Sequence, residues 1–179
     1  MVAEPRGGMG GVDPDEIAMG GGSAGRHLAA MVATTHGDEF FKDSESHVGV
    51  SDEVIAAVIM GTGVDQVARV KETKGGSVKN CVILFGGELN EVTEMNEKGS
   101  PITHLSGKAP PSLMIDRELD RPGQHYVEFR ERLDSLGVKN EFVMGPGAKH
   151  GQWSRMPFGK GFVTAMIEFV GSLSDSAEQ

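Results

Sequence analysis

The fold of this chain is decided by residues 17–28, which read IAMGGGSAGRHL. The first three residues are apolar and form a candidate buried strand, and the residues after Arg26 are good helix formers. Between them, residues 21–25 fit the pattern Gly-x-Ser-x-Gly, which places Ser23 on a sharp turn from strand to helix. Glycines avoid backbone clashes in such a turn, and the helix N-terminus would direct its free N–H groups at charge developing near Ser23. The glycines of this turn are Gly21, Gly22 and Gly25.

The same residues also fit a second pattern. Gly20, Gly22 and Gly25 form Gly-x-Gly-x-x-Gly, the fingerprint of dinucleotide-binding loops, which needs an acidic residue about 20 positions further on, at the end of a second strand. Asp38 and Glu39 have nearly the right separation, but their segment is polar and no strand precedes it. A third interpretation is a plain glycine-rich turn. These residues alone leave the nucleophile, the nucleotide loop and the plain turn open.

The composition narrows the classes of function. A chain of 179 residues is expected to form one domain, long enough to bury a hydrophobic core. Its net charge of −9 argues against nucleic acid or an anionic membrane surface as the main partner. No apolar run has the length of a membrane span, and the first residues lack the features of a signal peptide, so the compartment stays undetermined. The single cysteine, Cys81, excludes an internal disulfide, and no pair of histidines has the spacing of a zinc site on a helix.

Strands alternate with helices along the rest of the chain. This alternation predicts an α/β fold with a parallel sheet, flanking helices and right-handed crossovers. The predicted strands are residues 16–19, 54–60, 113–115 and 142–144. The predicted helices are residues 24–35, 65–74, 88–98, 124–136 and 158–173. We expect a single domain over residues 1–179, with a Gly/Pro-rich loop at 1–12 and a polar tail at 174–179. Residues 81–85 have the composition of a further strand.

Two more side chains lie where a serine nucleophile would need them. Such a serine requires a base within reach and an acid that holds the base, and in parallel sheets these groups gather at the carboxyl ends of strands. Asp120 follows the third predicted strand by a few residues, and His150 follows the fourth. The chain order Ser23, Asp120, His150 is the order expected when a Gly-x-Ser-x-Gly turn supplies the nucleophile. Glu118 is the alternative acid.

Three segments carry a resemblance to a known family. They are residues 12–17 before the turn, residues 101–103 and 110–111 ahead of Asp120, and PGAKHG at 146–151. In these segments the chain resembles the α/β-hydrolase family, in particular its small carboxylesterases and acetyl-esterase-like members. The resemblance covers residues 12 to about 172 and favours the nucleophile over the nucleotide loop.

The resemblance implies hydrolysis of a small-molecule carboxylic ester by an acyl-enzyme mechanism, without cofactor or metal. Ser23 would attack the acyl carbon, His150 would carry the proton, and Asp120 would hold the imidazole. The backbone N–H of Ala24 would be one oxyanion donor. The resemblance also makes residues 84–87 look like a cap segment over the site.

The chain departs from that family at three places. Asp116 and Arg117 stand where the family usually carries His-Gly, and we expect them to alter the turn after the strand or to pair on the surface. Arg26 stands near the site mouth, where a small residue is common. The family's earlier half, with four strands and a glycine-rich oxyanion loop, is absent, so we expect a partial fold.

Two consequences follow from that expected partial fold. The first strand would have an open edge through which copies self-associate, and the activity of this chain alone would be weak or absent. Two alternatives to an esterase stay open. One is a non-catalytic fragment or interaction module of the same fold, and the other is a nucleotide-binding domain.

Overall fold

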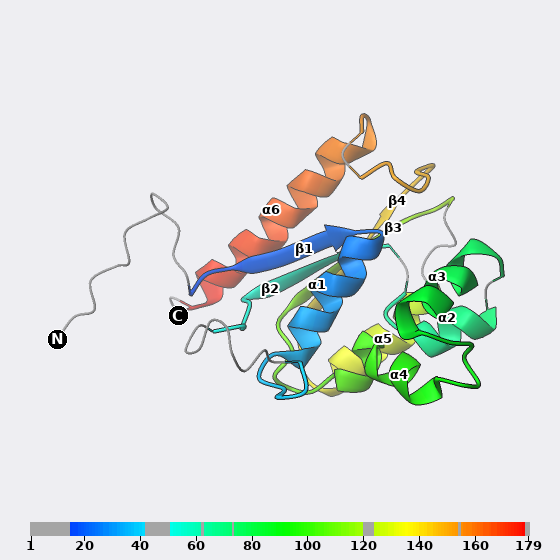
Figure 1. The fold of residues 1–179 in the computed structure, drawn as a ribbon. Helices are drawn as coiled ribbons and strands as arrows, with labels where there is room; N and C mark the ends of the chain where they lie inside the picture. Colours follow the sequence, from blue (N-terminus) through cyan, green and yellow to red (C-terminus); the bar gives the residue numbers. More distant parts are fainter. Residues whose placement is uncertain are drawn as a thin grey trace, which may run out of the picture.

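A parallel sheet forms the centre of the molecule, with its strands in the order β1-β2-β3-β4. The computed structural model describes residues 15–41, 51–61, 63–72, 74–119, 124–153 and 155–177. Within these residues the strands are β1 (Ala18–Gly22), β2 (Ala56–Met60), β3 (Ser112–Arg117) and β4 (Asn140–Gly145). All three neighbouring pairs are parallel, which confirms the predicted α/β fold (Figure 1).

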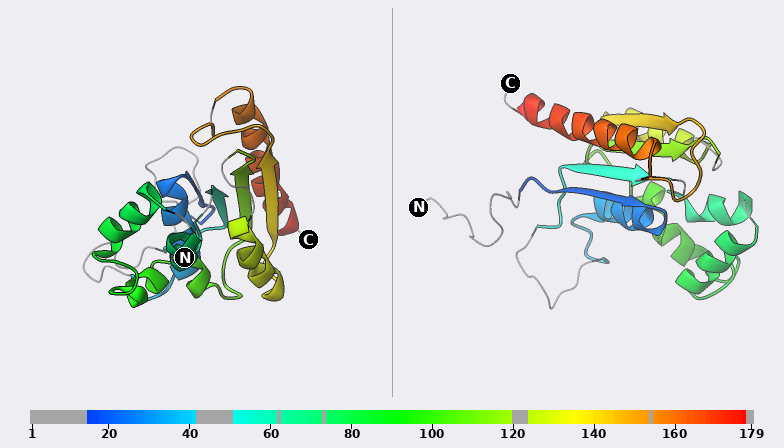
Figure 2. Two further views of the ribbon diagram at one scale, coloured as in Figure 1. Left: turned by 90° about the vertical axis from the view of Figure 1, so that its right-hand side faces the viewer. Right: turned by 90° about the horizontal axis from the view of Figure 1, so that it is seen from above.

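Helices cover both faces of this sheet and gather beyond its carboxyl ends. Alpha-helix α6 (Phe158–Ala177) lies on one face, while α1 (Ala24–Thr35) and α5 (Gln124–Ser135) lie on the other (Figures 1 and 2). Beside α1, past the arrowheads of the strands, lies a group of short helices (Figure 2). They are α2 (Gln66–Glu72), α3 (Gly76–Phe85), α4 (Thr93–Lys98) and the 3-10 turn η1 (Pro101–His104). No helix within the described residues is both long and apolar enough to cross a membrane.

The core has two halves because neighbouring residues of a strand point to opposite faces of the sheet. In β2, Ala57 and Ile59 pack toward α1 and α5, and Ala56 and Val58 pack toward α6. Strands β2 and β3 are therefore buried on both faces, which explains the apolar residues of β2 and of Leu113 to Ile115 in β3 and confirms both as central parallel strands.

Several predicted boundaries were wrong. Strand β1 begins two residues later than predicted and continues to Gly22, because the glycines pair in register with β2 despite their low strand propensity. Residues 81–85 do not form a strand; they are the second half of α3, which ends at Gly86 in the left-handed conformation, φ 82°. Helix α4 begins only at Thr93, and α6 extends four residues beyond Leu173.

Strand β1 lies at the edge of the described sheet. It pairs with β2 on one side, and no other described strand pairs with it on the other. Ile17, the apolar residue directly before this strand, is exposed to 39%. Within the described residues, the molecule therefore has the open edge that the sequence predicted.

Candidate active site

Ser23 occupies the turn between β1 and α1 in a backbone conformation that only glycine adopts readily. Its φ is 55° and its ψ −119°, and no other non-glycine residue in the described segments has a positive φ. The Ser23 N–H donates to the carbonyl oxygen of Met60 at 3.2 Å, which ties the turn to β2. Such strain persists where the surrounding structure imposes it, and it is typical of functional sites.

The glycines around Ser23 differ in the space that the structure leaves for a side chain. A Cβ on Gly21 would overlap the carbonyl group of Gly25, and a Cβ on Gly22 would lie 2.8 Å from Trp153 Nε1. Gly25 has open space at its Cβ position. The expected clash with backbone is thus confirmed for Gly21. At Gly22 the clash would be with a side chain instead, and for Gly25 the expectation is wrong.

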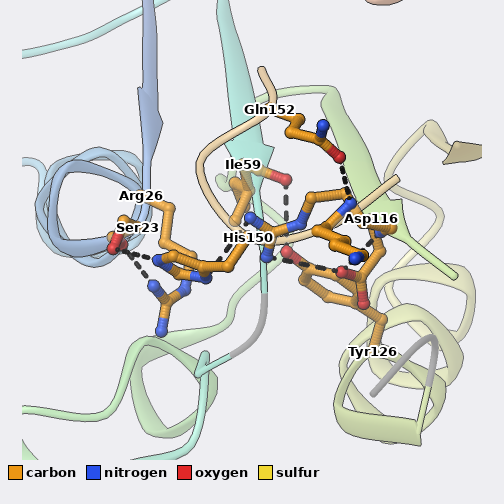
Figure 3. A network of polar contacts seen from close by, with 9 residues as sticks. Ser23, Arg26, Ile59, Asp116, Tyr126, His150 and Gln152 are labelled. Carbon is orange, nitrogen blue, oxygen red and sulfur yellow. Dashed lines mark hydrogen bonds and ion pairs between the residues drawn. The ribbon is translucent and has the colours of Figure 1, made fainter. Parts of the chain in front are cut away.

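His150 reaches Ser23 from the loop after β4. Its Nε2 lies 3.1 Å from Ser23 Oγ, although 127 positions separate the two residues in the chain (Figure 3). In the tautomer that carries its proton on Nδ1, the Ser23 hydroxyl donates to Nε2. A hydroxyl and an imidazole in this arrangement can act as a nucleophile and its general base.

The loops that follow β3 and β4 are joined by hydrogen bonds. The N–H groups of Glu118 and Leu119 donate to the carbonyl oxygens of Gly145 and Ala148, each at 3.1 Å. The Glu118 carboxylate accepts the N–H of Gly147 at 2.8 Å, so this side chain supports the histidine loop. Asp120, the predicted acid, lies outside the described residues and stays a prediction.

Asp116 and Arg117 are buried, which corrects the expectation of a surface pair. Their exposed fractions are 0% and 1%, because β3 lies inside the sheet and is covered to its last residue. The Arg117 guanidinium stacks on Trp153 at 3.6 Å from the ring centroid, and its Nη1 lies 3.4 Å from His150 Nδ1. A charge at the end of a strand is commonly solvated, so no signal in the sequence revealed this cluster.

Arg26 is also buried rather than standing at the site mouth. It is 6% exposed, and its Nη1 donates to the carbonyl oxygen of Ser23. Burial is the main cause that lowers the pKa of Arg26 from 12.5 to about 10, so the side chain stays cationic at neutral pH. Figure 3 shows Arg26 and His150 near Ser23, with Asp116 further along the same polar network.

A cavity of about 330 Å³ opens beside Ser23. Ser23 and Ala24 line it, so the predicted nucleophile and the predicted oxyanion donor border the same space. Leu84 from α3 also lines it, which puts part of the predicted cap segment at the site. Within the described residues, no three His, Cys, Asp or Glu side chains form a metal-binding group.

The structure does not support the dinucleotide interpretation of the glycines. Asp38 and Glu39 lie in the turn after the C-terminus of α1, whereas the glycines lie at its N-terminus. A helix of 12 residues is about 18 Å long, so these carboxylates are too far away to bind a ribose held at the glycine turn.

The chain is similar to esterases in sequence and in structure. It is 29% identical over 127 residues to the probable carboxylic ester hydrolase LipM of Mycobacterium tuberculosis, covering 69% of this chain and 29% of LipM. The truncated form of a carbohydrate esterase from gut microbiota superimposes with a TM-score of 0.77 at 22% identity, over 92% of this chain and 61% of that one. The acetyl ester-xyloside bifunctional hydrolase of Caldicellulosiruptor lactoaceticus gives a TM-score of 0.70 at 23% identity, over 91% and 58%.

These similarities agree with the observed fold and with the resemblance to α/β-hydrolases seen in the sequence. The chain spans less than two thirds of the length of each of these relatives. The structural neighbours confirm that the sheet and its helices have the α/β-hydrolase fold. The family model of BD-FAE matches residues 10–131, more than half of the sequence, and the chain therefore belongs to the BD-FAE family.

Proposed function

We propose that this chain hydrolyses carboxylic esters of small molecules through an acyl-enzyme intermediate. The observation that carries the proposal is the 3.1 Å separation of Ser23 Oγ and His150 Nε2 at a strained strand-to-helix turn. The names of LipM and of the carbohydrate esterase support the same chemistry. The chain covers only part of these relatives, so the activity is proposed for the chain itself and not transferred from them.

In the proposed reaction, Ser23 Oγ attacks the ester carbonyl carbon while His150 Nε2 accepts the hydroxyl proton. The carbonyl oxygen becomes an oxyanion, and the backbone N–H of Ala24 donates to it. The tetrahedral intermediate breaks its bond to the alkoxy oxygen, which takes the proton from His150 and leaves as the alcohol. Water then attacks the acyl-Ser23 ester by the same steps, and the acid and free Ser23 result. Asp120 would orient the His150 ring and stabilise its cation.

A non-catalytic interaction module of the same fold is the alternative. Its support is the edge of β1, which pairs with no described strand on one side and directly follows the exposed apolar residue Ile17. Unpaired N–H and C=O groups along a strand favour pairing with another chain. We therefore also propose that copies of the chain self-associate through this edge, whether or not they are active.

A fluorophosphonate probe tests the nucleophile directly. The probe should label Ser23, as located by peptide mass spectrometry, and Ser23→Ala should remove both the label and the hydrolysis of a short-chain 4-nitrophenyl ester. Ser106→Ala is the matched control because Ser106 is an exposed loop serine whose hydroxyl accepts only a weak bond from the Lys108 N–H at 3.3 Å. Undiminished hydrolysis in Ser23→Ala would show that another group is the nucleophile.

A further inference from the structure

We propose that the cavity beside Ser23 selects esters that carry an ionised carboxylate a few atoms from the scissile bond, with the Arg26 guanidinium as the counter-charge. This inference rests on the proposed ester hydrolysis and specifies its substrate class. The simplest such molecules are half-esters of short dicarboxylic acids, in which one end is the reacting ester and the other is a free carboxylate.

The cavity has the size and the position for such a substrate. Its volume of about 330 Å³ suits a small molecule, since ligand sites begin at about 300 Å³. Ser23 and Ala24 border it, and Leu84 provides an apolar part of its wall. A short acyl chain would therefore lie against Leu84 while its ester group meets the Ser23 hydroxyl.

Among the described residues, the charged side chains that line the cavity are cations. Arg26 from α1 and Arg69 from α2 both line it, and no carboxylate does so among the described residues. His27, a third lining residue, has its pKa lowered mainly by burial, so it adds no charge at neutral pH. The N-terminus of α1 points its positive dipole end at the same space. These positive charges attract an anion electrostatically, whereas an uncharged acyl chain gains nothing from them.

Arg26 is incompletely satisfied within the protein. Its Nη1 donates to the Ser23 carbonyl oxygen, but its buried Nε has no hydrogen-bond partner among the described residues. Arg69 and Arg117 act on Arg26 as like charges, and Asp116 acts on it as an opposite charge. Burying a cation without full pairing is unfavourable, and a bound carboxylate would relieve that cost.

The loop after β2 leaves room for the Arg26 side chain. A Cβ on Gly63 would overlap Arg26 Nη2, and a Cβ on Gly61 would lie 3.3 Å from Arg26 Cδ. The guanidinium is therefore enclosed by backbone that carries no side chain at these two positions, which holds it beside the nucleophile. A guanidinium held in one orientation pairs with a carboxylate through two parallel hydrogen bonds, which favours this anion.

The test compares two esters of the same shape and different charge. Monoethyl glutarate carries a carboxylate where ethyl 5-methylhexanoate carries an isopropyl group, and the release of ethanol measures the hydrolysis of both. With the full chain we expect kcat/KM to be about tenfold or more higher for the charged ester, the factor that one charge-assisted hydrogen bond contributes. Equal values, or a preference for the uncharged ester, would overturn the inference.

Substitution of Arg26 then tests whether its charge causes the preference for the charged ester. Arg26→Met should lower the ratio of the two kcat/KM values about tenfold, and Arg26→Lys should retain part of the preference. Both rates are measured on one preparation, so a smaller folded fraction cancels from the ratio. Lys108→Met is the control, because it removes one positive charge from an exposed loop ahead of β3, at the opposite end of the sheet. An equal loss of both rates in Arg26→Met, with the ratio unchanged, would contradict the inference.

The outcomes separate this inference from the proposed function. If the probe labels Ser23 and the two esters react equally well, the inference fails and the proposed function stands. If neither ester reacts and Ser23 is not labelled, the proposed function fails, and calorimetric titration with glutarate decides the inference alone. Binding of glutarate that Arg26→Met abolishes would then support the carboxylate site, and the absence of binding to the unsubstituted chain would overturn it.

Discussion

At the scale of single residues, the surroundings of His150 determine what Ser23 can do. One ring nitrogen of His150 meets the Ser23 hydroxyl, and the other faces the Arg117 guanidinium that stacks on Trp153. The Trp153 ring in turn packs against Gly22, the residue just before Ser23. Ser23 and His150 are thus positioned by one shared set of packed side chains.

A second histidine near the site makes stability depend on pH. His27 Nε2 lies 2.7 Å from the carbonyl oxygen of Gly99, and burial is the main cause that lowers the pKa of His27 below its ordinary 6.5. The unfolded chain therefore binds a proton at a higher pH than the folded one, and stability falls as the pH drops below about 6.5.

We expect the free energy of unfolding to decrease from pH 7 to pH 5 in urea titrations. The decrease should be smaller in His27→Gln, whose amide N–H can still donate to Gly99 and whose side chain does not titrate. His36→Gln is the control, since His36 lies at the C-terminal end of α1, away from Gly99. An identical pH dependence in the unsubstituted protein and in His27→Gln would show that His27 is not responsible.

At the scale of elements, physical differences explain which features the sequence could predict. Strands β2 and β3 were predictable because both of their faces are buried, and α1 was predictable because a Gly-x-Ser-x-Gly turn precedes it and His36-Gly37 follows it. Residues 81–85 were misassigned because five apolar residues are too few to distinguish a strand from a buried helix.

In the candidate active site, too, some features could be predicted from the sequence and others could not. Ser23 and His150 were predictable, since chain order and the ends of parallel strands bring them together. The burial of Arg26 and Arg117 was not, because it depends on side chains from other elements. Trp153 covers Arg117, and the glycines after β2 leave room for Arg26.

Alanine substitutions at Gly21 and at Gly25 should have different effects on folding and labelling. Gly21→Ala places a methyl group on the Gly25 carbonyl, so we expect loss of folding or of probe labelling at Ser23. Gly25→Ala meets open space within the first turn of α1, so labelling should persist and stability should rise by about 0.5–1 kcal/mol. Thermal unfolding and fluorophosphonate labelling of both variants check this. Tolerance of Gly21→Ala would contradict the packing described for the turn.

At the scale of the whole molecule, the edge of β1 is the feature most relevant to solution behaviour. The sheet ends at this strand within the described residues, and the apolar side chain of Ile17, directly before the strand, is exposed. An open edge with apolar neighbours is a site of association between copies unless a charge or a covering element blocks it.

We expect the purified chain of 19.0 kDa to sediment as a species larger than a monomer, with a concentration-dependent mass. Ile17→Lys should shift the distribution toward the monomer, because it places a charge directly before the edge strand β1. Val127→Lys is the control, since Val127 is exposed to 54% on α5, away from β1. A monodisperse monomer of the unsubstituted chain at all concentrations would refute association through this edge.

The alkylation rate of Cys81, the single cysteine of the chain, can report how often the packing around the cavity opens. Cys81 is 3% exposed, its Sγ lies 3.6 Å from Gln66 Oε1 between α3 and α2, and burial raises its pKa. Because Cys81 is buried and borders the cavity, a maleimide should react with it slowly, and the alkylation rate reports how often the packing around the thiol opens. A molecule held between Ser23 and Leu84 would slow the reaction in proportion to its occupancy, which gives a reading of binding that needs no turnover.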